Sequence, residues 1–199
     1  MRHAVLLFVL SLLSAGTSLA SEPNALYNHI SHDTTIQGFP CAKGETWFYP
    51  DGSLNQCRLS RPAVLGDVRV PGGSVVEFWP NGEAHFLLLQ RPMVLGGYRV
   101  RGGTRRGLSL GATTSFYNTG ELRSFYLVSN ESVQGVPCRG GSWNTITDPT
   151  GGDNFVEFYQ DGKLESCKLS HDFSGFRAGE RIAMPHFTVA SENRTRAAQ

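Results

Sequence analysis

A short motif that recurs four times constrains the fold of this chain more than any other feature of its sequence. In each copy an aromatic pair leads into a polar turn that contains glycine, and the copies read FYPDGSL at 48–54, FWPNGEA at 78–84, FYNTGEL at 116–122 and FYQDGKL at 158–164. Such a pattern is typical of a β-hairpin, and its recurrence predicts small β units that stack side by side. We therefore expect an all-β fold, an antiparallel meander of about four β-hairpin repeats that forms an elongated or curled sheet.

The motif can be extended on both sides, and the extended copies define the expected domain organisation. An N-terminal segment at 21–35 precedes a β-repeat domain at 36–190, and a flexible tail follows at 191–199. Within the domain the copies span about 36–63, 64–93, 94–132 and 133–172, with a partial copy at 173–190. Short β-branched and aromatic runs bounded by Gly, Pro and Asn predict strands throughout.

Residues 1–20 have the features of a secretory signal peptide. Arg2 supplies a positive charge, residues 4–13 form an apolar stretch, and Ser18-Leu19-Ala20 matches a cleavage site. We therefore expect a secreted or periplasmic protein without a transmembrane segment. The chain has 18 Lys+Arg against 17 Asp+Glu, so its bulk charge does not favour nucleic acid as a partner.

The cysteines occupy two positions of the repeat. Cys41 aligns with Cys138, and Cys57 aligns with Cys167. Copies two and three lack both cysteines, and when the copies are aligned on their opening glycines the corresponding residues are Arg69 and Arg99 at the first position, and Leu87 and Phe125 at the second. Joint presence or absence within a copy is what a bond inside that copy produces. We therefore predict the disulfides Cys41–Cys57 and Cys138–Cys167, formed in an oxidising compartment.

Two prolines decide between two turn geometries for the hairpins. A type I′ turn would place Pro50 where the strand ladder needs a backbone N–H, whereas a type I turn with glycine in the left-handed region, a G1 bulge, places Pro50 and Pro80 at a favoured position. We predict the bulge. The phenylalanine of each motif then faces the residue six positions later, and these pairs should stack into the core: Phe48 with Leu54, Phe78 with Ala84, Phe116 with Leu122, and Phe158 with Leu164.

The second aromatic residue of each motif falls on the opposite face, because side chains alternate along a strand. These residues are Tyr49, Trp79, Tyr117 and Tyr159, and we call them the aromatic stripe. Two interpretations are open at this stage. The stripe either packs against a second layer of the protein, or it is a row of partly exposed rings that contact sugars or a partner protein.

The element x-Y-x-x-G-x-L, seen in FYPDGSL and FYQDGKL, resembles the MORN repeat. The resemblance covers four short segments of about seven to ten residues. It implies an elongated sheet of β-hairpin repeats that serves mainly as an interaction or scaffold module.

Copies three and four carry insertions before their hairpins, at 104–113 and 143–154. Loops inserted into repeats often form the binding face. Arg101, Arg105 and Arg106 cluster at the first insertion, either as a contact for an acidic partner or as a solvated loop, and Trp143 begins the second. With the stripe, these four residues are our candidates for binding a protein or glycan partner; we identify no cofactor motif.

Groups that could catalyse a reaction are few. His29-x-x-His32-Asp33 is a partial match to a metal site and His171-Asp172 to half of a nucleophilic constellation, and in both a solvated histidine is the default expectation. Glu77 and Glu157, at one repeat position, are the best-matched candidates for the paired carboxylates of a glycosidase. We assign no catalytic or metal-binding residue. The favoured hypothesis is an exported, non-enzymatic binding or scaffold protein; the alternative is a secreted hydrolase of a polysaccharide or cell-wall polymer, with the stripe as its substrate platform.

Overall fold

A computed structural model describes residues 26–105, 108–109, 112–141 and 154–185. These residues form strands and turns and no helix, so none of them provides a helix that could cross a membrane. The predicted signal peptide at 1–20 and the predicted tail at 191–199 lie outside the described residues, as do Arg106 and Trp143.

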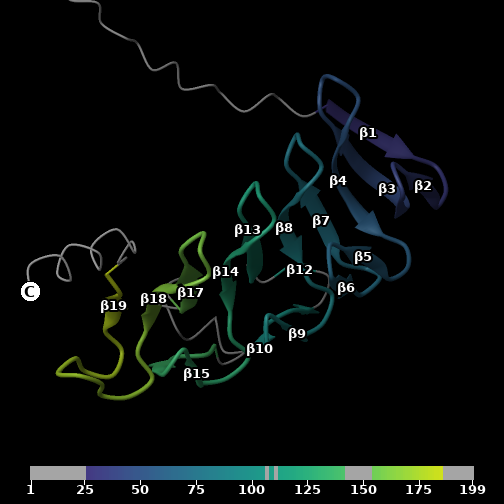
Figure 1. Cartoon of the computed structure of the whole chain (residues 1–199). Helices are drawn as coiled ribbons and strands as arrows, with labels where there is room; N and C mark the ends of the chain where they lie inside the picture. The colour runs from purple at the N-terminus through teal and green to yellow at the C-terminus, as the bar shows by residue number, and fades with distance from the viewer. Residues whose placement is uncertain (1–25, 106–107, 110–111, 142–153, 186–199) are drawn as a thin grey trace, which may run out of the picture.

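Most strands belong to one wide antiparallel sheet, in which they lie side by side along the length of the molecule (Figure 1). The order is β1, β3, β4, β7, β8, β13, β14, β17, β18 and β19, with β2 paired to β3. The strands at the two ends, β1 and β19, do not pair with each other, so the sheet is open. The bounds are β1 Leu26–Ile30, β2 Thr34–Ile36, β3 Phe39–Phe48, β4 Leu54–Leu59, β7 Val75–Phe78, β8 Ala84–Leu88, β13 Thr113–Phe116, β14 Leu122–Tyr126, β17 Phe155–Phe158, β18 Leu164–Lys168 and β19 Arg181–Ala183.

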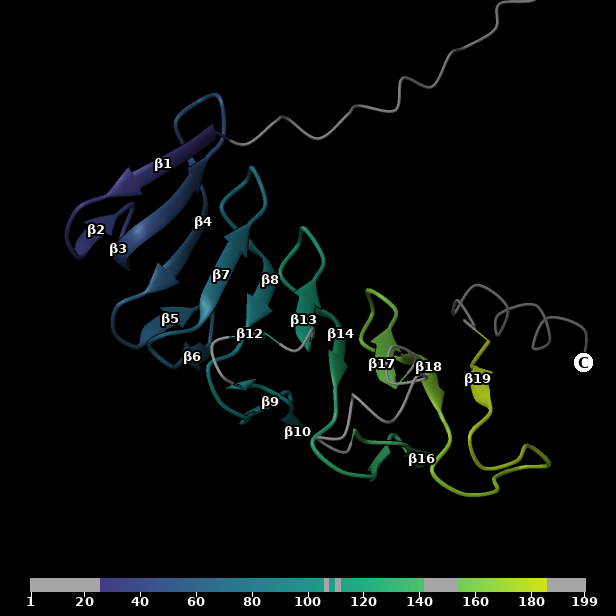
Figure 2. The same cartoon turned by 180° about the vertical axis from the view of Figure 1, so that it is seen from behind.

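We call the strand pairs β3–β4, β7–β8, β13–β14 and β17–β18 of the sheet the long hairpins. Between successive long hairpins the chain forms short hairpins, which follow one side of the sheet in both views (Figures 1 and 2). They are β5 Ala63–Leu65 with β6 Val68–Val70, β9 Met93–Leu95 with β10 Tyr98–Val100, and β15 Glu131–Val133 with β16 Val136–Cys138. A further pair, β11 Thr104–Arg105 and β12 Leu108–Ser109, lies in the first insertion.

The core lies between the sheet and these short hairpins. The ring of Tyr98 in β10 stacks on Phe125 of the sheet at 5.6 Å between centroids, and Phe125 in turn stacks on Phe158 at 5.7 Å. Val70 and Val100, which end the short hairpins, are fully buried in the same cluster. We call the face of the sheet that packs on this layer the inner face, and the opposite face the outer face.

The four long hairpins turn in the predicted way. In each, the glycine N–H donates to the carbonyl of the second aromatic residue at 2.9 or 3.0 Å, and the glycine has φ between 79° and 95°. These contacts define a type I turn with a G1 bulge. The predicted phenylalanine pairs are also confirmed, because Phe48, Phe78, Phe116 and Phe158 lie opposite Leu54, Ala84, Leu122 and Leu164.

Both predicted disulfides are confirmed. Cys41 is bonded to Cys57 and Cys138 to Cys167, and all four side chains are buried. The bonds are compatible with an extracellular or otherwise oxidising compartment.

The alignment that accompanied the disulfide prediction is wrong by one residue in copies two and three. Residues opposite Ala63 and Met93 are Val70 and Val100, just as Cys41 lies opposite Thr34, so valine rather than arginine replaces the first cysteine. The slip arises because Gly38 is the second residue of its two-residue turn, whereas Gly66 is the first of its own. A shift of one residue moves a side chain to the other face of a strand, so Arg69 and Arg99 point outward and are exposed.

Candidate functional site

The outer face carries a row of side chains that lie directly opposite one another from strand to strand. We call it the outer row: Trp47, Gln56, Glu77, Phe86, Ser115, Ser124, Glu157 and Ser166. Because alternate residues of a strand point to opposite faces, the buried neighbours of this row form the core while the row itself faces away from it. Aromatic, amide, carboxylate and hydroxyl groups therefore stand side by side across eight strands.

A groove with a volume of about 310 Å³ opens in the outer row at Gln56, Glu77 and Phe86. Val75 of β7 with Phe86 and Leu88 of β8 form most of its lining. Gln56, Glu77 and Thr113 supply an amide, a carboxylate and a hydroxyl. Its volume and its mixture of an apolar surface with a few polar groups are typical of small ligand sites.

A tight cluster borders this groove. The Nδ1 of His85 lies 3.1 Å from Oε1 of Glu77. The imidazole contacts the rings of Trp79 and Phe86 in tilted arrangements, with ring centroids 3.5 and 3.7 Å apart. His85 is only 8% exposed. The contact with His85 holds the Glu77 carboxylate in one orientation, so the groove presents a fixed hydrogen-bond acceptor.

The position of His85 follows from a second irregularity in each long hairpin. Phe78 pairs with Ala84 but Glu77 pairs with Phe86, so His85 is an extra residue in β8. A bulge of this kind re-aims a side chain, and the same shift recurs at Asn55, Arg123 and Glu165. At copy three the extra residue again covers the stripe, since the Arg123 guanidinium lies 5.6 Å from the centre of the Tyr117 ring.

The aromatic stripe joins each of the first three long hairpins to the next, and the fourth to the residue that follows β19. Tyr49 donates from its hydroxyl to the carbonyl of Phe78 at 2.7 Å, Trp79 from its indole to that of Phe116 at 3.3 Å, Tyr117 to that of Phe158 at 2.8 Å, and Tyr159 to that of Met184 at 2.8 Å. Tyr49 is 7% exposed, and the other three are half-buried. The packing interpretation of the stripe therefore describes contacts that are present, while binding by its half-exposed members stays a proposal.

The hydrogen bond from Tyr117 to the carbonyl of Phe158 requires a protonated phenol. Burial, and after it the nearby carboxylate of Glu165, raise the pKa of the Tyr117 phenol above its ordinary value. The hydroxyl is therefore protonated, and able to donate, at neutral pH.

The two carboxylates at one repeat position have different surroundings. Glu157 is paired with Arg181 at 2.7 Å and accepts a hydrogen bond from Ser166 at 2.7 Å, whereas Glu77 faces the groove beside His85. Four strand steps separate them in the outer row, which corresponds to about 19 Å at the usual strand spacing. Paired glycosidase carboxylates stand about 5 to 9.5 Å apart, so Glu77 and Glu157 do not form such a pair.

The remaining predicted residues do not gather at this groove. Arg101 is buried, at 6% exposure, with its guanidinium against Gly141, so of the two alternatives left open for the arginine cluster, a solvated loop does not describe this residue. For Arg105 the structure describes the backbone in β11. Asp33 and Asp172 accept hydrogen bonds from the main chain of Lys43 and Ala178, both at 2.8 Å, and thus stabilise turns.

Sequence analysis missed most of the groove. Gln56, Phe86 and Thr113 belong to three different long hairpins, and only the register between strands brings them together. No group of His, Cys, Asp and Glu side chains in the described part of the chain is arranged to hold a metal ion.

Comparison with known proteins found no matching family model, no similar curated protein and no similar solved structure.

Proposed function

We propose that this chain is an exported, non-enzymatic binding protein whose outer face holds a partner, with a glycan chain as the favoured ligand. The groove beside Glu77 carries the proposal. Its apolar surface, formed by Phe86 with Val75 and Leu88, suits the C–H face of a sugar ring, and Gln56, Glu77 and Thr113 can bond sugar hydroxyls.

The construction of the sheet supports a binding platform. Each hairpin is bonded to the next by the stripe, and two disulfides lie in the core. A surface held in this way loses little conformational entropy when a ligand binds. The MORN-like character of the hairpins and a secreted or periplasmic location belong to the same proposal, and they rest on the sequence motifs and the disulfides.

The hydrolase alternative is less well supported. Glu77 lies about 19 Å from the matched carboxylate of Glu157, and Glu157 is engaged by Arg181 at 2.7 Å. Among the described residues, the Glu77–His85 contact favours it, because a histidine beside a carboxylate can act as an acid or base.

The test measures binding of soluble neutral and amino-sugar oligosaccharides to the purified protein by calorimetry. Phe86→Ala combined with Gln56→Ala should weaken binding of any captured oligosaccharide by at least about tenfold. Phe176→Ala is the matched control, since Phe176 is 49% exposed and lies outside the groove. Release of reducing ends that disappears in Glu77→Gln would establish the hydrolase instead, and failure of all oligosaccharides to bind would refute a glycan ligand.

A further inference from the structure

Two short hairpins are nearly the same, although the long hairpins that follow them have diverged. Residues 61–70 read RPAVLGDVRV and residues 91–100 read RPMVLGGYRV, with seven of ten positions identical. The following segments 75–89 and 113–127 share only four of fifteen. Three of those four are the core phenylalanine, the turn glycine and a buried leucine, and the fourth is an exposed glutamate, Glu83 in one copy and Glu121 in the other.

Several of the shared residues point into solvent, so packing does not explain them. Val64 and Val94 are 64% and 63% exposed. Each lies opposite an exposed arginine, Arg69 or Arg99. The corresponding pairs in copies one and four are Thr35 with Pro40 and Ser132 with Pro137, so the valine–arginine pair is confined to the two central copies.

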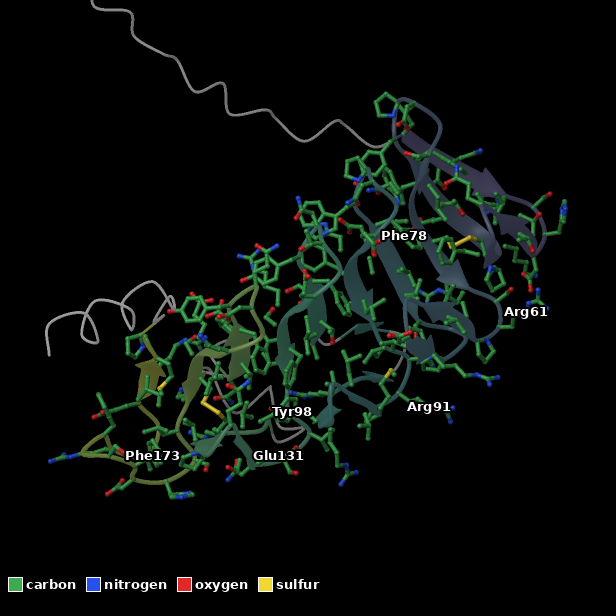
Figure 3. All side chains as sticks on the ribbon, viewed as in Figure 1. Arg61, Phe78, Arg91, Tyr98, Glu131 and Phe173 are labelled. Atoms are coloured by element: carbon green, nitrogen blue, oxygen red, sulfur yellow. A yellow bond between two sulfur atoms is a disulfide. The ribbon has the colours of Figure 1, made fainter. Side chains whose placement is uncertain are left out.

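Two more arginines complete a basic surface. Arg61 and Arg91 precede β5 and β9, and Figure 3 shows their nitrogen tips directed away from the ribbon along one margin of the molecule. We call Arg61, Arg69, Arg91 and Arg99, with the two valines, the arginine ridge. Within the described residues none of these four guanidiniums makes an ion pair or a hydrogen bond; Glu131 accepts from the main chain of Arg99 instead, at 3.5 Å.

An acidic, partly apolar cavity adjoins the ridge. It has a volume of about 500 Å³, and Phe39, Leu87 and Phe116 contribute its apolar surface. Asp67, Glu83 and Glu121 bring three exposed carboxylates to its lining, and none of them forms an ion pair within the described part of the chain. Val64 lines this cavity as well as belonging to the ridge, so the basic and acidic surfaces are continuous.

We propose that this combined surface binds a second copy of the same chain, with the arginine ridge of each copy placed on the acidic cavity of the other. A patch that carries both signs side by side is self-complementary under a two-fold axis, which is the commonest symmetry of protein dimers. Pairing buries Val64 and Val94 and supplies the cation that the cavity lacks. The proposal is independent of the glycan groove, which lies on the outer face.

Charge complementarity is the reason to choose a second copy over an unknown partner. Both the four arginines and the three carboxylates belong to this chain, whose formal net charge is only +1. Apart from a proline and the turn glycines, the exposed positions kept between the two central copies are the arginines, the valines and Glu83 with Glu121. These residues are the two sides of the proposed contact. Arginine also bonds carboxylates bidentately, which gives such a contact a defined geometry.

Sedimentation velocity of the purified protein over a range of concentrations tests the proposal. The parent protein should form dimers that weaken as salt rises from about 0.05 to about 0.5 M, because screening shortens the reach of charges. Arg69→Glu with Arg99→Glu should raise the dimer dissociation constant by at least about tenfold. Arg123→Glu with Arg177→Glu changes the net charge equally at exposed arginines outside the ridge, and it should leave the constant unchanged.

A charge exchange identifies the groups that pair. Adding Glu83→Arg and Glu121→Arg to the two ridge substitutions should restore dimers to within about threefold of the parent. Circular dichroism checks that each variant is folded; if the ridge variant unfolds, Arg61→Gln with Arg91→Gln replaces it. A parent that remains monomeric, a dimer insensitive to the ridge, equal loss in the control pair, or no rescue by the exchange would each overturn the proposal.

Discussion

Two buried threonines are predicted to destabilise the fold, and replacing them by valine should stabilise it. Thr46 and Thr114 are both 0% exposed, and neither Oγ1 has a hydrogen-bond partner among the described residues. They occupy one position of the repeat, two residues before the core phenylalanine, where the other copies have the fully buried Val76 and Val156. The protein therefore already contains valine at this site in two of its four hairpins.

The magnitude follows from the desolvation of the hydroxyl. A buried polar group without a partner costs about 1 to 3 kcal/mol, and valine has nearly the same shape and an equal preference for strands. Thr114→Val should raise the free energy of unfolding by about 1 kcal/mol. Four strand steps separate Thr46 from Thr114, about 19 Å, so the double variant should gain about 2 kcal/mol by simple addition.

Urea unfolding with the disulfides intact measures this gain as a higher midpoint at unchanged slope. Thr113→Val is the matched control, because Thr113 is half-exposed on the outer face and its replacement should change stability by less than about 0.5 kcal/mol. Equal or lower stability of Thr114→Val would show that the buried hydroxyl is already satisfied and that the reasoning is wrong.

Two further predictions concern the long hairpins. Tyr49→Phe removes the hydroxyl that bonds the carbonyl of Phe78 and should lower the free energy of unfolding by about 1 kcal/mol; an unchanged urea midpoint would show that this bridge contributes nothing. Gly162→Val places a β-branched residue at φ 79° and should cost more than about 1 kcal/mol, whereas Lys163→Val at the neighbouring exposed position serves as its control, and equal midpoints for the two would contradict the left-handed turn.

The predictions that hold are those that depend on local chemistry. Pro50 and Gly52 specify the turn because proline fixes one dihedral angle and glycine tolerates a positive one, and the turn then sets the register of Phe48 with Leu54. The disulfide pairing could also be predicted from the sequence, because cysteine appears in both positions of a copy or in neither.

The contacts that the sequence did not reveal join residues far apart in the chain. The hydroxyl of Tyr117 reaches a carbonyl 41 residues away, and the groove combines residues of three hairpins. In the N-terminal segment at 21–35, β1 and the start of β2 pair with β3, a contact that the sequence analysis did not predict. Pairing of this kind depends on which strand edge is free, and a single sequence carries no direct signal of that.

The two cysteine positions of the repeat are filled differently in the outer and the central copies. Copies one and four lie toward the two ends of the sheet, and each contains a disulfide, which links β3 to β4 in copy one and β16 to β18 in copy four. The central copies have a neighbour on each side and use apolar residues at the same positions, Val70 with Leu87 and Val100 with Phe125, all at most 1% exposed. Repeats at the ends of a stack have fewer neighbours to stabilise them, so covalent bonds are of most use there. The two central hairpins are also the ones whose outward positions carry arginine, which places the proposed contact with a second copy on the part of the stack that is packed from both sides.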